Sequence, residues 1–135
     1  MTALLLSALI LWPAPAPAAP EPPAVTGWAS AYAPGVMEDV IAYRMAYDIW
    51  PHGAPPVDWY TVAGAIATND CRQVGSIMRL IAPDGRAYRV LVADCAGDDG
   101  GADFMTRNNI VAELDWRLWS RLTETHGRPL KVTLR

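Results

Sequence analysis

The chain has 135 residues, of which 52% are hydrophobic and 19% charged, and its formal net charge is -3. This balance excludes an intrinsically disordered chain, and the collagen, coiled-coil and multi-span membrane classes do not fit it either. A negative net charge also argues against nucleic-acid binding, which usually relies on a basic surface. The length suits one compact domain with a modest core, because two domains of half this size would each be marginally stable.

The N-terminal stretch differs in composition from the rest of the chain. Residues 1–26 hold six of the twelve prolines and a single charged residue, Glu21. Residues 2–12 (TALLLSALILW) form an uncharged apolar run that is short for a membrane span but suits the hydrophobic part of a secretory signal. The small residues at 16–18 (APA) match the positions that a signal peptidase reads.

These features predict a signal peptide at 1–18, a Pro/Ala-rich extended spacer at 19–26 and a folded domain at 27–135. An uncleaved membrane anchor is the alternative, because no Lys or Arg precedes the apolar run. In both cases the domain lies outside the cytoplasm, either secreted or in the cell envelope. The cleaved protein is expected to be a monomer that contacts no lipid bilayer.

Cys71 and Cys95 are the two cysteines of this chain. In an exported protein these two cysteines predict a single disulfide. It would close a loop of roughly 25 residues and stabilise the fold by about 3 kcal/mol in the chain-entropy model. One alternative is a nucleophilic Cys95 activated by His126. A structural zinc site is disfavoured because His52 and His126 follow no ligand spacing. We expect neither a metal nor a cofactor.

The first part of the domain contains one strand and one ambiguous segment. Gly27 to Tyr32 (GWASAY) predicts a short strand, which Pro34-Gly35 ends as a turn. Residues 36–49 have apolar side chains at helical spacing, yet their Tyr, Val and Ile content also suits a strand. The proline-rich residues 51–56 predict a loop.

The centre of the chain gives clearer strand signals. Val62 to Thr68 is a short apolar strand. Residues 76–82 and 86–93 predict two further strands, joined by the turn sequence Pro83-Asp84-Gly85 as a hairpin. A glycine-rich loop is expected at 95–102.

The best helical pattern follows that loop. Leucine or isoleucine recurs every fourth residue, at Ile110, Leu114, Leu118 and Leu122. Thr106 suits the N-cap of this helix, Gly127 and Pro129 suit its end, and residues 130–134 predict a last strand. Many short strands with one helix in the C-terminal half predict an all-β fold, a small β-barrel.

Four short motifs resemble, in their order and spacing, those of the RlpA-like double-psi β-barrel domains, which are related to the barwin and expansin folds. They are Gly27–Tyr32, Gly75-Ser76 ahead of the Pro-Asp-Gly turn, Val92-Ala93-Asp94, and Asp103-Phe104-Met105. The resemblance implies a barrel of six strands in which two loops cross. It also implies a protein that binds or acts on cell-wall glycans, because some members are lytic transglycosylases that cleave peptidoglycan.

The resemblance also implies candidate catalytic residues. The family uses an Asp and a His; Asp94 matches the Asp, but residues 67–71 (ATNDC), where the His would stand, contain none. The chain therefore resembles a divergent member that lacks this His. A related group of murein-cleaving barrels uses clustered aspartates, a part that Asp70, Asp94 and Asp103 could play.

Glycosidic cleavage needs a group that protonates the leaving oxygen. Asp94 is the candidate acid, because Asp70 or Asp103 nearby would raise its pKa by like-charge repulsion. A disulfide would bring Asp70 and Asp94 close together, since each precedes one of the cysteines. The structural alternative is that Asp94 accepts hydrogen bonds from loop amides and Asp103 caps a helix. A calcium site at Asp94, Asp98, Asp99 and Asp103 is disfavoured because the spacing is not that of an EF-hand.

Aromatic side chains supply the predicted sugar contacts, because their flat apolar faces can stack on sugar rings. The predicted substrate-binding residues are Trp28, Tyr32, Trp59, Tyr60 and Asn69. The alternative is that some of these aromatic residues fill the core. Trp116 and Trp119 lie off the leucine stripe of the predicted helix, so one of them is expected to be exposed.

Together these features predict an exported cell-envelope protein that binds peptidoglycan or a related polysaccharide. In the enzymatic version it cleaves the glycan with Asp94 as general acid and base. The alternative is a non-catalytic, disulfide-stabilised barrel that binds the cell wall or another protein.

Overall fold

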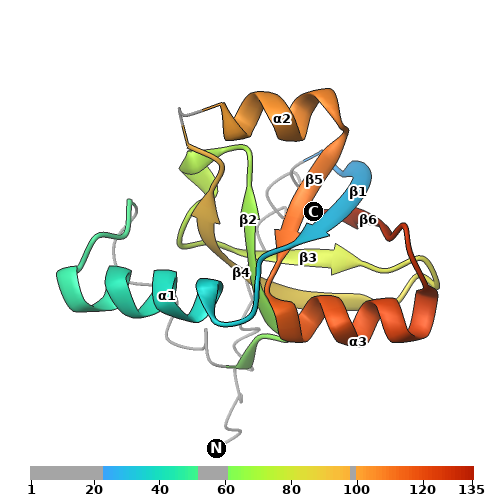
Figure 1. Cartoon of the computed structure of the whole chain (residues 1–135), viewed down its shortest axis with the longest axis horizontal. Coiled ribbons are helices and arrows are strands. Elements are labelled where there is room, and N and C mark those ends of the chain that lie inside the picture. The colour runs from blue at the N-terminus through green and yellow to red at the C-terminus, as the bar shows by residue number, and fades with distance from the viewer. Residues whose placement is uncertain (1–22, 52–60, 98–99) are drawn as a thin grey trace, which may run out of the picture.

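The computed structural model describes residues 23–51, 61–97 and 100–135, in which six strands close into a barrel (Figure 1). Within these described ranges, three helices and the short 3-10 turn η2 connect or flank the strands. The strands are β1 (Val25–Ala31), β2 (Gly64–Thr68), β3 (Ile77–Ile81), β4 (Ala87–Cys95), β5 (Ile110–Leu114) and β6 (Lys131–Leu134). The helices are α1 (Val36–Tyr47), α2 (Gly101–Arg107) and α3 (Trp116–His126), and the 3-10 turn is η2 (Cys71–Gln73).

The strand order around the barrel is β1-β5-β2-β4-β3-β6. β1 runs parallel to β5 and β2 runs parallel to β4, while the other neighbouring pairs are antiparallel. Exchanging β1 with β4, β2 with β5 and β3 with β6 reproduces the same set of neighbours, so the barrel consists of two topologically equivalent halves. Parallel neighbours need connections that cross an end of the barrel. This is the six-stranded double-psi arrangement that the RlpA-like resemblance implied.

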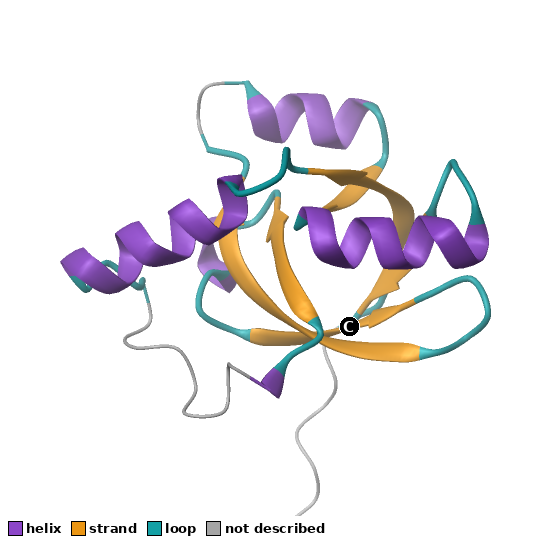
Figure 2. Ribbon diagram, turned by 60° about the horizontal axis from the view of Figure 1, so that its bottom comes forward, coloured by secondary structure: helices purple, strands orange, loops and turns teal. Residues whose placement is uncertain are grey.

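The barrel is filled mainly by small and branched side chains. β4 buries four consecutive residues completely, Val90 to Ala93, and Ile66 and Ala67 of the neighbouring β2 are equally buried. α1 contacts β4 and α3 contacts β2. Because both faces of these two strands are covered, their buried residues form continuous runs instead of alternating. The three helices pack on the outside of this barrel (Figure 2).

The five predicted strands are all present, and each begins and ends within two residues of the predicted bounds. The hairpin between β3 and β4 closes at the predicted turn, where the Gly85 amide donates to the Ala82 carbonyl at 2.9 Å. Gly85 has a positive φ of 82°, a conformation that glycine adopts at no steric cost. Local sequence patterns were therefore sufficient for these elements.

The prediction of one long helix between Thr106 and Gly127 is wrong, although the helix does end at Gly127. Residues 110–114 form β5, which lies between β1 and β2, and two separate helices precede and follow it. Thr106 is not an N-cap but lies inside α2, where its hydroxyl donates to the Ala102 carbonyl at 2.9 Å. The leucine stripe survives only in α3, as the buried Leu118 and Leu122.

The break has two local causes and one tertiary cause. Asn109 has a left-handed φ of 52°, which ends the helical path, and Asp115 starts a new helix by accepting a hydrogen bond from the Leu118 amide at 2.7 Å. The adjacent β-branched residues Ile110 and Val111 favour a strand. The barrel also needs β5 to pair with β1 on one side and β2 on the other, because an open sheet would leave exposed edges.

The ambiguous segment 36–49 is largely helical and forms α1. Met37 is its buried residue, and Asp48 with a left-handed φ of 51° ends the helix. Much of the apolar surface of α1 stays exposed, including Tyr43 and Tyr47. Figure 1 shows α1 extending beyond the barrel instead of lying across it.

The predicted signal peptide and residues 19–22 of the predicted spacer lie outside the described residues, while Val25 and Thr26 of that spacer belong to β1. Within residues 23–51, 61–97 and 100–135, none of the helices has the length and apolar character needed to cross a membrane. The disulfide between Cys71 and Cys95 is compatible with an extracellular protein.

Candidate functional site

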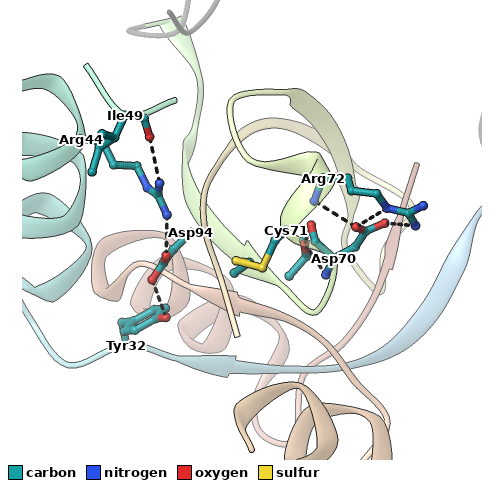
Figure 3. Close-up of a disulfide and its surroundings, with 9 residues drawn as sticks. Tyr32, Arg44, Ile49, Asp70, Cys71, Arg72 and Asp94 are labelled. Atoms are coloured by element: carbon teal, nitrogen blue, oxygen red, sulfur yellow. Dashed lines mark hydrogen bonds and ion pairs between the residues drawn. A yellow bond between two sulfur atoms is a disulfide. The ribbon is translucent and has the colours of Figure 1, made fainter. Parts of the chain in front are cut away.

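Cys71 and Cys95 form the predicted disulfide (Figure 3). Cys95 is the last residue of β4 and Cys71 is the first residue of η2, which follows β2. Because β2 and β4 are parallel neighbours, their C-terminal ends meet, and Thr68 pairs with Cys95 in the register. The disulfide occupies both thiols, so it excludes the alternative of a nucleophilic Cys95 activated by His126.

Asp94, immediately before Cys95, forms a polar cluster with Tyr32 and Arg44 (Figure 3). The Tyr32 hydroxyl donates to one carboxylate oxygen of Asp94 at 3.1 Å, and Nη2 of Arg44 donates to the other at 3.0 Å. Tyr32 directly follows β1, Arg44 lies in α1, and Asp94 lies near the end of β4. We call these three residues the Asp94 cluster.

The Asp94 cluster is largely shielded from water. The side chains of Arg44 and Asp94 are 17% and 22% exposed, so their ion pair is stronger than a fully solvated one. Nη1 of Arg44 donates to the Ile49 carbonyl at 3.1 Å, and the guanidinium lies 5.9 Å from the ring centre of Trp50. These contacts orient the guanidinium toward Asp94 and attach α1 to the barrel.

A groove of about 560 Å³ runs between α1 and the end of β4. Its polar lining residues are Asp39, Arg44 and Asp94, and its apolar ones are Val36, Val40, Tyr43 and Ile49. We call it the Asp94 groove. Apolar walls with a few fixed polar groups are typical of small-molecule and carbohydrate sites.

The other two predicted catalytic aspartates have partners of their own. Asp70 accepts hydrogen bonds from the Arg72 side chain at 2.8 and 2.9 Å and from the Arg72 amide at 3.0 Å. These bonds, above all those from the Arg72 side chain, lower the pKa of Asp70 below its ordinary value, because they favour the charged carboxylate. Figure 3 shows the carboxylates of Asp70 and Asp94 facing different arginines.

Asp103 lies on α2, and its side chain is 79% exposed. Its partner is Arg107 one turn later, at 3.6 Å. It does not cap the helix, because the N-cap position is Gly100 and no side chain bonds there. The structure therefore brings Asp94 together with Tyr32 and Arg44, and the catalytic roles of Asp70 and Asp103 stay predictions.

The predicted sugar-binding residues lie in several places. Tyr32 belongs to the Asp94 cluster. Trp28 is 38% exposed on β1, with the Lys131 ammonium 5.9 Å from its ring centre. Asn69 lines a different cavity, next to α2. Trp59 and Tyr60 lie outside the described residues.

One of the two tryptophans on α3 is exposed, as predicted: Trp116 is 41% exposed and Trp119 is 8% exposed.

His126, near the end of the same helix, has its Nε2 3.7 Å from a carboxylate oxygen of Asp84. Among the described residues, no three His, Cys, Asp or Glu side chains cluster in a way that could hold a metal ion. Asp98, Asp99 and His52 lie outside that part of the chain.

Arg44 and Asp115 are two functional or structural residues that were not predicted from the sequence. Arg44 is the only cation within residues 36–49, and a single basic residue in a largely apolar segment is a usable signal for an ion pair. Asp115 is 7% exposed and accepts hydrogen bonds from the Leu118 and Ala65 amides. Its position directly before Trp116 was the N-cap signal for α3.

Comparisons with known proteins found no matching family model, no matching curated protein and no matching solved structure. The RlpA-like resemblance consequently stays a prediction that rests on the four sequence motifs, while the closed six-stranded barrel is a property of the structure.

Proposed function

We propose that this protein is exported to the cell envelope and binds peptidoglycan or a related polysaccharide in the Asp94 groove. The observation that carries the proposal is the Asp94 cluster, a shielded carboxylate and guanidinium at fixed positions among apolar side chains. Sugars present hydroxyl groups at their edges and apolar C–H surfaces on their faces. A groove with Arg44 and Asp94 for the edges and Tyr43 for a face matches both kinds of surface.

Glycan cleavage by Asp94 is the second candidate function. It is favoured by the position of Asp94 in the groove, next to the Tyr32 hydroxyl. Asp94, however, accepts hydrogen bonds on both carboxylate oxygens, from Tyr32 and Arg44. To protonate a leaving oxygen it would first have to separate from Arg44, so the geometry supports binding better than cleavage.

A protein-interaction barrel is the remaining alternative. The observation in its favour is the exposed apolar surface of α1, where Tyr43 is 58% and Tyr47 is 66% exposed. A partner that covers α1 would also close the Asp94 groove, because Val36, Val40 and Tyr43 line it.

The test is co-sedimentation of the purified protein with peptidoglycan sacculi, followed by mass spectrometry of the released products. The wild type should co-sediment. Asp94→Asn should weaken binding by roughly 10- to 100-fold, because a hydrogen bond to a charged group is worth about 1.5–3 kcal/mol. Asp103→Asn is the matched control, since Asp103 is exposed on α2 away from the groove.

The released products decide between binding and cleavage. Anhydro-muropeptides released by the wild type and not by folded Asp94→Asn would establish a lytic transglycosylase, and products with reducing ends would establish a hydrolase. Binding without release would establish a wall-binding module. If folded wild-type protein neither binds nor releases anything, the peptidoglycan proposal is wrong.

A further inference from the structure

A second cavity, of about 170 Å³, lies where β2 ends and β5 begins, next to α2. It shares no lining residue with the Asp94 groove. Three carboxamide side chains line it, those of Asn69, Gln73 and Asn109. None of its lining residues carries a charge. We call this the carboxamide cavity.

The three carboxamides are free to bind a ligand. Within the described residues, no hydrogen bond joins the side chain of Asn69, Gln73 or Asn109 to another protein group. The neighbouring Asn108 behaves differently, since its amide group donates to the Phe104 carbonyl at 2.8 Å at the end of α2. The three carboxamides without a hydrogen bond to a described protein group therefore all line the carboxamide cavity, whereas Asn108 does not.

The backbone beneath these side chains is held in place. Asn69 and Gln73 stand two residues before and after Cys71, whose disulfide ties η2 to β4. The Gln73 carbonyl accepts hydrogen bonds from the Ser76 hydroxyl at 2.6 Å and the Ser76 amide at 3.0 Å. The Asn109 carbonyl accepts one from the Trp28 amide at 2.8 Å. The cavity therefore presents its carboxamides from a fixed frame, which lowers the entropic cost of binding.

The lining identifies the chemical class of the ligand. Each carboxamide offers both a donor and an acceptor, and this pairs best with a neutral amide. The remaining wall includes Met78 and Met105, whose thioether side chains adapt to a small apolar group. The volume is below the roughly 300–1,000 Å³ of pockets that enclose whole ligands, so it suits one substituent of a larger molecule.

We propose that the carboxamide cavity binds an acetamido group, with the amide on the carboxamides and the methyl group against the methionines. The bearer would be an N-acetylated sugar of a glycan, and this choice over an amide of a peptide rests on the proposed function. The cavity then selects for acetylation, independently of the polar contacts in the Asp94 groove.

Isothermal titration calorimetry with the trisaccharide of N-acetylglucosamine tests this inference, with the fully de-acetylated trisaccharide as the matched ligand. The acetylated ligand should bind at least roughly tenfold more tightly, because the de-acetylated one offers the carboxamides no amide partner and places an ammonium group in an uncharged cavity. Addition of the acetylated trisaccharide should shift the side-chain amide resonances of Asn69, Gln73 and Asn109 in NMR spectra of the isotope-labelled protein.

Two variants keep the test independent of folding. Gln73→Met preserves the side-chain length, and Asn109→Gly preserves the left-handed backbone, for which Asn109 has φ 52°. Each should weaken binding of the acetylated trisaccharide by about 2- to 12-fold, the equivalent of one hydrogen bond. Asn108→Ala is the control of the same residue type, and it should leave the affinity unchanged because Asn108 does not line the cavity.

Equal affinity for the two trisaccharides, or wild-type affinity in both folded variants, would overturn the inference. The proposed function fails separately. If binding of sacculi depends on Asp94 and not on Gln73, only the proposed acetamido site is wrong. If acetyl-selective binding survives Asp94→Asn, only the proposed role of the Asp94 groove is wrong.

Discussion

Asp70, Asp94 and Asp103 look equivalent in the sequence, and each pairs with an arginine in the structure. Their surroundings differ. Both side chains of the Asp94–Arg44 pair are at most 22% exposed, while Arg72 is 87% exposed and both members of the Asp103–Arg107 pair exceed 70%. Solvent-exposed ion pairs contribute little free energy. Asp94 is therefore the aspartate of the three whose charge contributes most to the candidate site.

Asp70 gives a pH prediction. Hydrogen bonds from the Arg72 side chain and amide lower its pKa below the ordinary value of 3.8. Since the native pKa lies below the unfolded one, this interaction stabilises the fold above pH 3.8 and is lost as the pH falls through the lowered native pKa. Arg72→Gln should raise the pKa of Asp70 toward 3.8, as measured by NMR titration of its carboxyl carbon. An unchanged pKa would show that Arg72 does not bind Asp70 in solution.

At the scale of elements, α3 depends on one buried carboxylate. Asp115 accepts a hydrogen bond from the Leu118 amide at the start of α3 and another from the Ala65 amide of β2. It therefore both caps the helix and fixes the helix to the barrel. Gly64 permits this close approach, because a Cβ at that position would collide with the Asp115 carboxylate.

We predict that Asp115→Ala lowers the free energy of unfolding by roughly 2–4 kcal/mol. Loss of the cap costs about 1 kcal/mol, and the Ala65 amide left without a partner costs about 1–3 kcal/mol more. Urea denaturation measures the difference. Asp103→Ala, on the exposed face of α2, should stay within about 0.5 kcal/mol of the wild type. Equal losses in the two variants would contradict the role assigned to Asp115.

The elements also show how far the sequence could be interpreted. Alternation and turn residues predicted five strands correctly, because these signals are local. The spacing of Ile110 and Leu114 fits both a helix turn and the same face of a strand, so periodicity could not separate the two. Only the position of residues 110–114 between β1 and β2 decides that they form a strand.

At the scale of the whole molecule, the disulfide connects the two halves of the barrel. Cys71 follows β2 of the first half and Cys95 ends β4 of the second half. It also stands between the two proposed sites, since Asp94 precedes Cys95 and the carboxamides of Asn69 and Gln73 flank Cys71. One covalent bond thus supports the backbone next to both proposed sites.

Replacing both cysteines, Cys71→Ser with Cys95→Ser, should lower the free energy of unfolding by about 3 kcal/mol, because the unfolded chain regains the entropy of a closed loop. Thermal denaturation checks this, and wild-type protein in excess reductant should melt like the double variant. A melting temperature unaffected by either treatment would show that the barrel does not rely on the bond. A reduced protein that stays folded should also bind the acetylated trisaccharide more weakly, because η2 is no longer tied to β4.

Strong local signals in the sequence were sufficient to predict the β-barrel class, the hairpin turn at 83–85 and the cysteine pair. The polar cluster required the tertiary structure. Tyr32 and Arg44 lie 62 and 50 residues before Asp94, and no local pattern links residues so far apart. The parallel crossings of the barrel bring them together, because they place the ends of β1, β4 and α1 at one point. Contacts of this kind depend on strand order, which hydrophobic periodicity does not encode.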